Sequence, residues 1–128
     1  MEIGRLDHVN IRTANLDQMV IWYETVLGMV SGRRPDFPFP GAWLYAGEQA
    51  MVHLIAVEGD AGTGSESALK LEHFAFRARG LKQLIARLEA AGERYDTAPL
   101  PGVDITQVNI WDPDGNHIHI DFSSSEVE

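Results

Sequence analysis

The chain has 128 residues, of which 45% are hydrophobic and 23% are charged, a composition typical of one folded domain. It contains no cysteine, which excludes disulfides, thiolate metal sites and cysteine nucleophiles and leaves His, Asp or Glu to hold any metal. Nineteen acidic and ten basic residues give a formal net charge of −9, which disfavours nucleic acids and anionic membranes as partners.

Neither a membrane-spanning segment nor a secretory signal is expected. No apolar run approaches the roughly 20 residues that a membrane helix needs. The N-terminus enters a strand-like pattern almost at once, in place of the basic and apolar segments of a signal peptide. Because the chain also lacks cysteine, we expect a cytoplasmic protein.

The first half of the chain predicts a strand, a helix and three further strands. The first strand is expected at 6–12, in the segment Leu-Asp-His-Val-Asn-Ile-Arg. An apolar stripe with helical spacing follows, formed by Leu16, Met19, Val20, Tyr23, Val26 and Leu27. A short strand around 29–34 and a hairpin with strands near 43–45 and 51–55 complete a β-α-β-β-β unit.

The second half repeats this pattern about 65 residues later. Residues 71–77 match residues 6–12, with Leu, His and Arg identical and the acidic residue preserved in kind. A second helical stripe consists of Leu81, Leu84, Ile85 and Leu88. A strand around 94–97 and a hairpin with an Asp-Pro-Asp-Gly turn at 112–115 follow, and the last strand ends at Phe122.

Both predicted helices have recognisable ends. Asn15 and Gln18 have the spacing of a capping box at the start of the first helix. Gly28 and Gly92 suit the left-handed conformation with which helices commonly end.

We therefore expect one domain, 1–128, of the α+β class. Its βαβββ units lie at about 5–57 and 70–122, joined by a Gly- and Ser-rich linker at 58–69. The two tandem units are expected to form a cupped, mostly antiparallel eight-stranded sheet with the helices on its outer face. Residues 123–128 are interpreted as a mobile acidic tail.

Four of the five histidines occupy matching positions in the two units, His8 with His73 and His53 with His119. A single histidine in a strand is more often a satisfied core residue than a ligand, but four at symmetric positions favour a metal site. If the two sheets curl toward each other, the four imidazoles meet on the concave face. Such neutral ligands suit a divalent ion such as Fe, Ni, Zn or Co.

The last strand carries further polar residues on the same side. Because side chains alternate along a strand, His117, His119 and Asp121 share the helix-free face. The residue that matches His117 in the first unit is a methionine, so we interpret His117 as lining a pocket or carrying a proton.

Residues 5–122 resemble the vicinal oxygen chelate superfamily, which includes glyoxalases, bleomycin resistance proteins and dioxygenases. The motifs that carry the resemblance are Leu-Asp-His-Val at 6–9, the helix from Trp22-Tyr23 to Leu27-Gly28, Leu-Glu-His-Phe-Ala-Phe at 71–76 and Asp-Pro-Asp-Gly-Asn at 112–116. The resemblance implies metal ligands on the first and last strands of each unit, at His8, His53, His73 and His119. It also implies a small-molecule substrate and a homodimer.

This chain departs from the family pattern at two of these positions. Glyoxalase-like members usually have Glu or Gln in the place of His53, and nearly all metal-using members have Glu in the place of His119. A ligand set made only of histidines leaves the metal its full positive charge, so Asp121 or His117 would have to move any proton. Strand rise puts Asp121 about 6.6 Å from His119, near enough to act through water. The alternative is that Asp121 is a solvated residue at a strand end.

The sequence favours a metal-dependent enzyme that chelates a small oxygen-bearing molecule, with dioxygenase-type oxidation slightly ahead of a glyoxalase-like lyase or isomerase. A non-catalytic protein that binds a drug or another small molecule is the alternative. The aromatic and proline-rich loop 33–41 either lines the substrate pocket through Phe37 and Phe39 or is a stiff connection between two strands.

Overall fold

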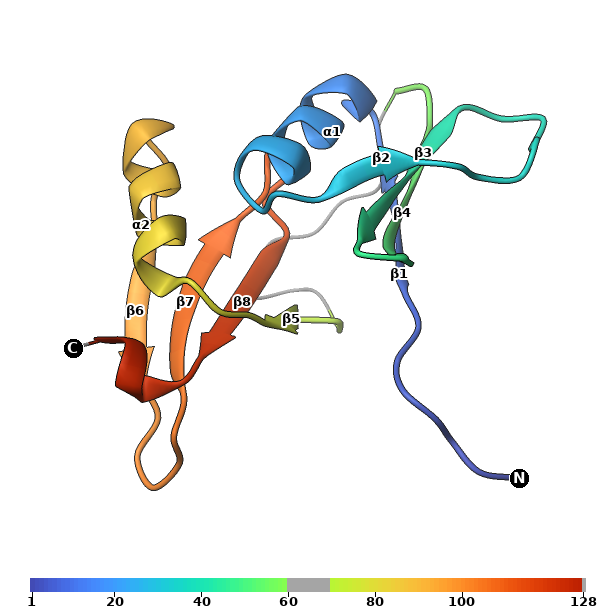
Figure 1. Cartoon of the computed structure of the whole chain (residues 1–128). Coiled ribbons are helices and arrows are strands. Elements are labelled where there is room, and N and C mark those ends of the chain that lie inside the picture. The colour runs from blue at the N-terminus through green and yellow to red at the C-terminus, as the bar shows by residue number, and fades with distance from the viewer. Residues whose placement is uncertain (60–69, 128) are drawn as a thin grey trace. The chain divides into compact units, whose positions relative to one another are not determined.

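The computed structural model describes residues 1–59 and 70–127 (Figure 1). The chain divides into two compact units, which we call unit 1 (Met1–Thr63) and unit 2 (Gly64–Glu128), and each is described by itself. Most of the linker predicted at 58–69 lies outside the described residues. In the described part of the chain, no helix is long and apolar enough to cross a membrane.

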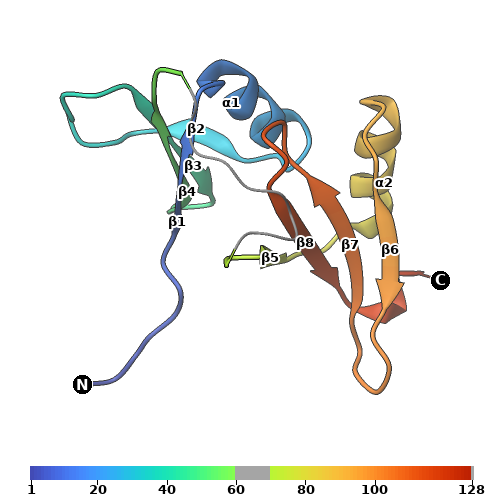
Figure 2. The same ribbon diagram turned by 180° about the vertical axis from the view of Figure 1, so that it is seen from behind.

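Unit 1 has one helix and a four-stranded sheet (Figure 2). Its elements are β1 (Val9–Thr13), α1 (Leu16–Thr25), β2 (Val30–Gly32), β3 (Gly41–Ala46) and β4 (Gln49–Ala56). The strand order is β1-β4-β3-β2, in which β1 and β4 are parallel and the other two pairs are antiparallel. The helix packs against β2, β3 and β4, and so covers one face of the sheet.

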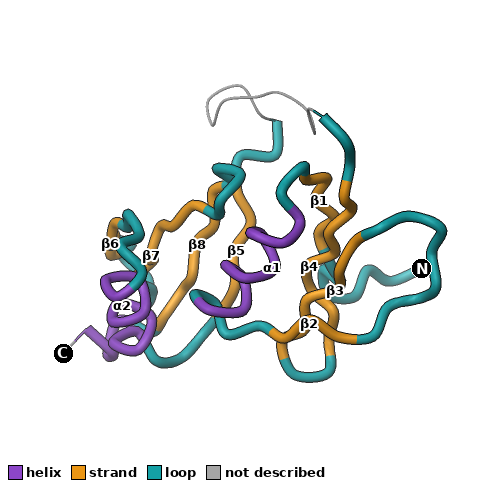
Figure 3. The backbone as a smooth tube through the Cα atoms, turned by 90° about the horizontal axis from the view of Figure 1, so that it is seen from above, coloured by secondary structure: helices purple, strands orange, loops and turns teal. Residues whose placement is uncertain are grey.

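Unit 2 repeats this arrangement. Its elements are β5 (His73–Arg77), α2 (Leu81–Ala90), β6 (Asp96–Pro99), β7 (Thr106–Trp111), β8 (His117–Phe122) and the short 3₁₀ helix η1 (Ser124–Val127). Figure 3 shows its strands side by side in the hydrogen-bonded order β5-β8-β7-β6, with β5 and β8 parallel. The predicted α+β class and the two βαβββ units are confirmed. The hydrogen bonds join the strands in two sheets of four, and the union of both sheets in one cup stays a prediction.

Each unit has an apolar core between its helix and its sheet. In unit 1 the buried side chains include Met19, Trp22, Tyr23, Val26, Leu44, Val52 and Leu54. In unit 2 they include Leu84, Leu88, Val108, Ile110, Ile118, Ile120 and Phe122. Because successive side chains of a strand point to opposite faces, the residues between these core positions lie on the helix-free face. That face carries the histidines.

The C-terminal ends of both helices are as the sequence predicted, whereas the N-terminal end of α1 differs from its prediction. Gly28 and Gly92 have φ values of 70° and 67°, the left-handed conformation predicted for them. Asn15 occupies the N-cap of α1, but its side chain makes no capping hydrogen bond, so the predicted capping box with Gln18 is wrong. Its backbone N–H donates to the Thr13 hydroxyl at 2.9 Å, which ties the chain to the end of β1.

Residues 123–127, the described part of the predicted mobile tail, are instead folded against unit 2. They form η1, from which the Glu126 carboxylate accepts hydrogen bonds from the backbone N–H groups of Gly80 and Leu81 at 2.8 and 3.0 Å. Gly80 is the N-cap of α2 and has no side chain with which to cap it. A carboxylate 46 residues away therefore satisfies the first N–H groups of this helix, where negative charge is also favoured.

Glu126→Gln is expected to lower the melting temperature by a few degrees at neutral pH. The backbone N–H groups of Leu81 and Gly80 lower the pKa of the Glu126 carboxyl from its ordinary 4.5. The stabilisation by this carboxylate is therefore present above pH 4.5 and is lost as the pH falls through the lowered folded-state pKa. Calorimetry from pH 3 to 7 checks this, with the exposed turn variant Glu48→Gln as control. A wild-type advantage that does not shrink in acid would contradict it.

Candidate metal centre

Three histidines of unit 2 come together on the helix-free face of its sheet. His73 on β5 lies directly opposite His117 on β8, and His119 is two residues further along β8. One ring nitrogen from each lies within 4.8 Å of the other two. The rings of His73 and His119 are stacked at 4.0 Å, and the ring of His117 meets them edge to face at 5.5 and 4.7 Å. Two nitrogens that bind one ion are about 3 to 4 Å apart, so this cluster has the right size.

Unit 1 holds the matching pair. His8 directly precedes β1, and His53 lies on β4. Their rings are stacked at 3.9 Å, and Trp43 covers the other side of the His53 ring at 4.0 Å. The Nε2 of His53 donates to the Ala50 carbonyl at 3.0 Å, which leaves the lone pair on Nδ1. The structure thus brings each predicted pair together within its unit, while the set of all four as ligands of one ion stays a prediction.

The first histidine of each unit is hydrogen-bonded to the acidic residue that directly precedes it in the sequence. The Asp7 carboxylate accepts a hydrogen bond from His8 Nδ1 at 2.6 Å, and Glu72 accepts one from His73 Nδ1. Because an ionised carboxylate can only accept, Nδ1 carries the proton in both rings and the lone pair is on Nε2. Sequence reasoning gave these acids no role, although the preserved acid before each histidine was a usable signal.

His117 has contacts on several sides. Its Nδ1 bonds the second oxygen of Glu72 at 2.9 Å, and its Nε2 bonds the side-chain oxygen of Asn109 at 3.0 Å. Trp111 is stacked on its ring at 5.2 Å, and the guanidinium of Arg94 lies 3.7 Å from the Trp111 ring centre on the indole face. His117 is therefore held firmly inside the cluster.

The buried histidines are suited to bind a cation in their neutral form. Burial, followed by the neighbouring His73 and His117, lowers the pKa of His119. Burial, followed by His8, likewise lowers the pKa of His53. The Nδ1 atom of His119 is buried and has no hydrogen-bond partner among the described residues. A buried nitrogen without a partner is costly unless it meets a donor or a cation, so this atom fits a metal ligand.

Asp121 is the second group in this area that lacks a partner. Its Oδ1 atom is buried and makes no hydrogen bond in the described part of the chain. Alternation along β8 puts its side chain on the face of His117 and His119, and its strand neighbours are Arg77 and Gln107. Asp121 as a whole is half-buried, so one of its oxygens is shielded from solvent, and its role as a proton carrier stays a prediction.

The loop between β2 and β3 is held by its own side chains. The Phe37 and Phe39 rings are stacked at 5.0 Å, and the Arg34 guanidinium lies 5.1 and 5.4 Å from their centres. Arg34 also donates to the Phe39 carbonyl at 3.1 Å. These contacts support the stiff connection predicted as one of two roles. Phe37 extends the stack toward Trp43, with ring centres 6.4 Å apart.

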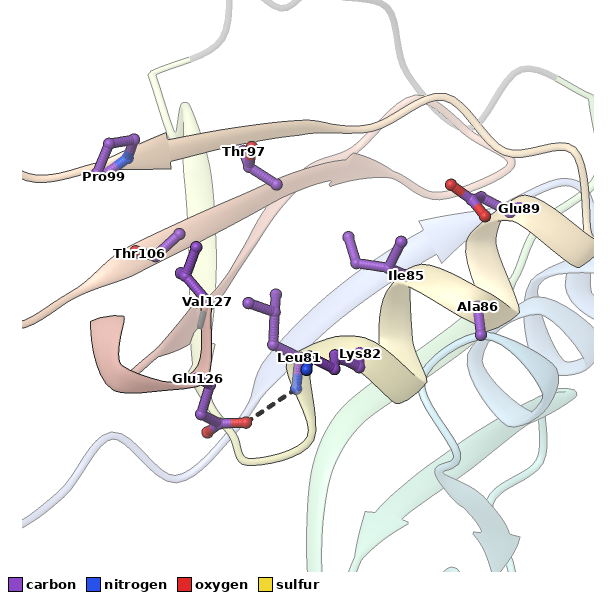
Figure 4. A pocket seen from close by; sticks show the side chains of 10 residues that line it. All are labelled: Leu81, Lys82, Ile85, Ala86, Glu89, Thr97, Pro99, Thr106, Glu126 and Val127. Atoms are coloured by element: carbon purple, nitrogen blue, oxygen red, sulfur yellow. Dashed lines mark hydrogen bonds between the residues drawn. The ribbon is translucent and has the colours of Figure 1, made fainter.

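A cavity of about 410 Å³ lies elsewhere in unit 2, between α2, β6, β7 and η1 (Figure 4). Leu81, Ile85 and Val127 give it a mostly apolar lining. Thr106 of β7 also lines the cavity, so the direction of its side chain shows which face of the sheet the cavity adjoins. Thr106 alternates along β7 with Asn109 and so points to the opposite face. The cavity is therefore on the helix side of the sheet, and the histidine cluster is on the other side.

The donor set of unit 2 fits a divalent transition metal. Imidazole nitrogens suit Zn, Fe, Ni and Co. The cluster offers two suitable rings, that of His119, whose pKa is lowered, and that of His73, whose other nitrogen is bonded to Glu72. Among the described residues, the group whose ligand atoms lie within 4.8 Å of one another contains histidines and no carboxylate. Such a site differs from the arrangement of two histidines and one carboxylate that is typical of non-haem iron oxygenases.

Comparison with known proteins gives consistent matches. The model of the Glyoxalase/Bleomycin resistance protein/Dioxygenase superfamily matches residues 5–120. An Arabidopsis thaliana protein, Glyoxylase I 4, is 29% identical over 125 residues, which are 94% of this chain and 71% of that protein. A glyoxylase/bleomycin resistance protein/dioxygenase domain from a Frankia species has a TM-score of 0.79 at 20% identity, covering 95% of this chain and 99% of that one. Lactoylglutathione lyase from Agrobacterium tumefaciens has a TM-score of 0.70 at 19% identity, covering 95% and 96%. These two solved structures share the fold.

Proposed function

The chain belongs to the Glyoxalase/Bleomycin resistance protein/Dioxygenase superfamily, and on that premise we propose that it is a metal-dependent enzyme whose small substrate binds through two neighbouring oxygen atoms. The observation that carries the proposal is the imidazole cluster of unit 2, in which His119 Nδ1 is buried and has no hydrogen-bond partner in the part of the chain that the structure describes. A structural histidine would have found a hydrogen bond, whereas a ligand keeps its lone pair for a cation.

The ligands that we propose in unit 2 are His73 and His119, with His8 and His53 as their counterparts in unit 1. A divalent ion held by neutral imidazoles would act as a Lewis acid on a chelating substrate. The four histidines would bind and orient it, and burial lowers the pKa of His53 and His119, which favours the neutral form of these two rings. We also propose that the protein is a cytoplasmic homodimer.

The reaction class that these residues support best is a proton transfer of the glyoxalase-like lyase or isomerase kind. Asp121 has a buried carboxylate oxygen that makes no hydrogen bond to the described residues, and it follows His119 by two residues on β8, which by alternation gives both the same face. In this role Asp121 would take a proton from the carbon that bears one chelating oxygen and return it to the adjacent carbon, which bears the other. His117 is the second group placed to carry a proton, as proposed from the sequence.

Dioxygenase-type oxidation, which the sequence slightly favoured, is the second candidate. An imidazole cluster also suits iron, which supports this reading. The third is the non-catalytic binding protein, for which the stacked rings of Phe37 and Phe39 and the neighbouring tilted ring of Trp43 would supply aromatic surface.

Metal content is expected to separate these candidates. The untagged protein, purified without oxygen, is analysed for elements and then assayed with the hemithioacetal of a 2-oxoaldehyde and glutathione. Near-stoichiometric Zn, Ni or Co with isomerisation of the hemithioacetal supports the proposed lyase or isomerase. Near-stoichiometric iron with consumption of O₂ favours the dioxygenase. The absence of bound metal even after reconstitution would refute the enzyme and favour the binding protein.

A further inference from the structure

Glu72 bonds two histidines at once. One of its oxygens accepts a hydrogen bond from His73 Nδ1, and the other lies 2.9 Å from His117 Nδ1. The two histidines are direct neighbours on the parallel strands β5 and β8, so one carboxylate spans the strand pair. The Glu72 side chain itself is 52% exposed, so these bonds are not a by-product of core packing.

The same carboxylate separates the roles of the two rings. With Nδ1 protonated toward Glu72, His73 keeps its lone pair on Nε2. His117 has its Nδ1 on Glu72 and its Nε2 on Asn109, so both of its nitrogens are engaged. Binding an ion through His117 would break one of these bonds, whereas binding through His73 breaks none of those described.

Unit 1 offers an internal comparison. Its acid Asp7 bonds His8 in the same manner, through Nδ1 at 2.6 Å. The residue that matches His117 there is Met51, which has no imidazole for Asp7 to hold. The sharing of one carboxylate between two rings is therefore particular to unit 2 and follows from His117.

We propose that Glu72 is the positioning residue of this metal centre, fixing His73 in the tautomer that can bind an ion and holding His117 outside the ligand set. Carboxylates that receive the second N–H of a ligating histidine commonly serve this purpose. The ion in this inference rests on the proposed function. The tautomer of His73 and the orientation of His117 are properties of the metal-free chain.

The first test uses the full, metal-free chain labelled with ¹⁵N in its histidines. Two-bond ¹H–¹⁵N correlation spectra distinguish the Nδ1–H from the Nε2–H tautomer of each ring. Wild-type His73 is expected in the Nδ1–H form, and Glu72→Ala is expected to convert it to a mixture and to shift the His117 signals. Asp7→Asn serves as matched control and should affect His8 alone. An unchanged His73 tautomer in Glu72→Ala overturns the proposal.

The second test is calorimetric titration with Zn²⁺ alone. Glu72→Ala is expected to weaken binding about 10- to 100-fold at unchanged stoichiometry, which is the usual effect of losing such a partner. His117→Gln should weaken it less than His73→Ala does, and equal losses in these two variants would overturn the exclusion of His117 from the ligand set. If the wild type binds no Zn²⁺ but Glu72→Ala still shifts the tautomer, the proposed function fails while the orienting role of Glu72 stands.

Discussion

His73→Ala is expected to lower the affinity for Zn²⁺ about 100-fold or more and to abolish metal-dependent turnover. Structural zinc sites bind with about 10 to 16 kcal/mol, which is about 3 kcal/mol for each of four ligands, and 2.8 kcal/mol corresponds to a factor of about 100. The His73 side chain is 39% exposed, so its truncation removes little core and the variant should fold. Calorimetric titration of the metal-free protein measures the effect.

His8→Ala is the informative companion, because His8 is the repeat mate of His73. An equal loss of affinity would support all four repeat-related histidines as one ligand set. Unchanged affinity in His8→Ala would confine the ligands to unit 2. Full metal content in purified His73→Ala would refute the site, and circular dichroism of both variants excludes unfolding as the cause of a loss.

Asp121→Asn is expected to reduce turnover of the hemithioacetal by about 10² to 10⁴, the usual contribution of a positioned acid or base. The amide has nearly the shape of the carboxylate but cannot accept the proton. Because Asp121 is not among the proposed ligands, metal content and Zn²⁺ affinity should stay near the wild-type values. The measurement is the maximal rate at saturating substrate, with metal analysis of the same sample.

Asp17→Asn is the matched control for this substitution. Asp17 is exposed in the first turn of α1, on the helix-covered face of its sheet, so the same loss of charge occurs away from the histidines. Turnover of the control should be unchanged. Retained turnover in Asp121→Asn would remove Asp121 from the chemistry and leave His117 as the remaining proton carrier of the proposal.

Most of the fold can be predicted from the sequence, because local patterns determine each element and the same order of elements occurs in both halves of the chain. Three patterns each determine the structure of their own segment. They are the apolar stripe of α1, the left-handed glycine after the C-terminal end of each helix, and the strict polar and apolar alternation of β8. The repeat of about 65 residues then shows that both halves share one topology. Alternation also placed His117 and His119 on one face, where their rings meet at 4.7 Å, and it predicts the same face for Asp121.

What the sequence left open depends on contacts between residues distant in the chain. No residue near Glu126 in the sequence predicts that it caps a helix that begins 46 residues earlier. The acidic composition of 123–128 alone predicts a mobile tail. Similarly, Glu72 meets His117 across 45 residues only because β5 and β8 pair in parallel with His73 opposite His117.

The features of the candidate metal site divide in the same way between those that the sequence determines and those that the tertiary structure determines. The sequence by itself determined which residues are repeated, which face they share and that no thiolate takes part. Tertiary structure decided which nitrogen of His8, His53 and His73 carries the proton, and which polar atoms of the described residues are buried without a partner. The physical reason is that side-chain identity and strand parity are properties of a segment, whereas hydrogen-bond partners and burial exist only once separate segments pack together.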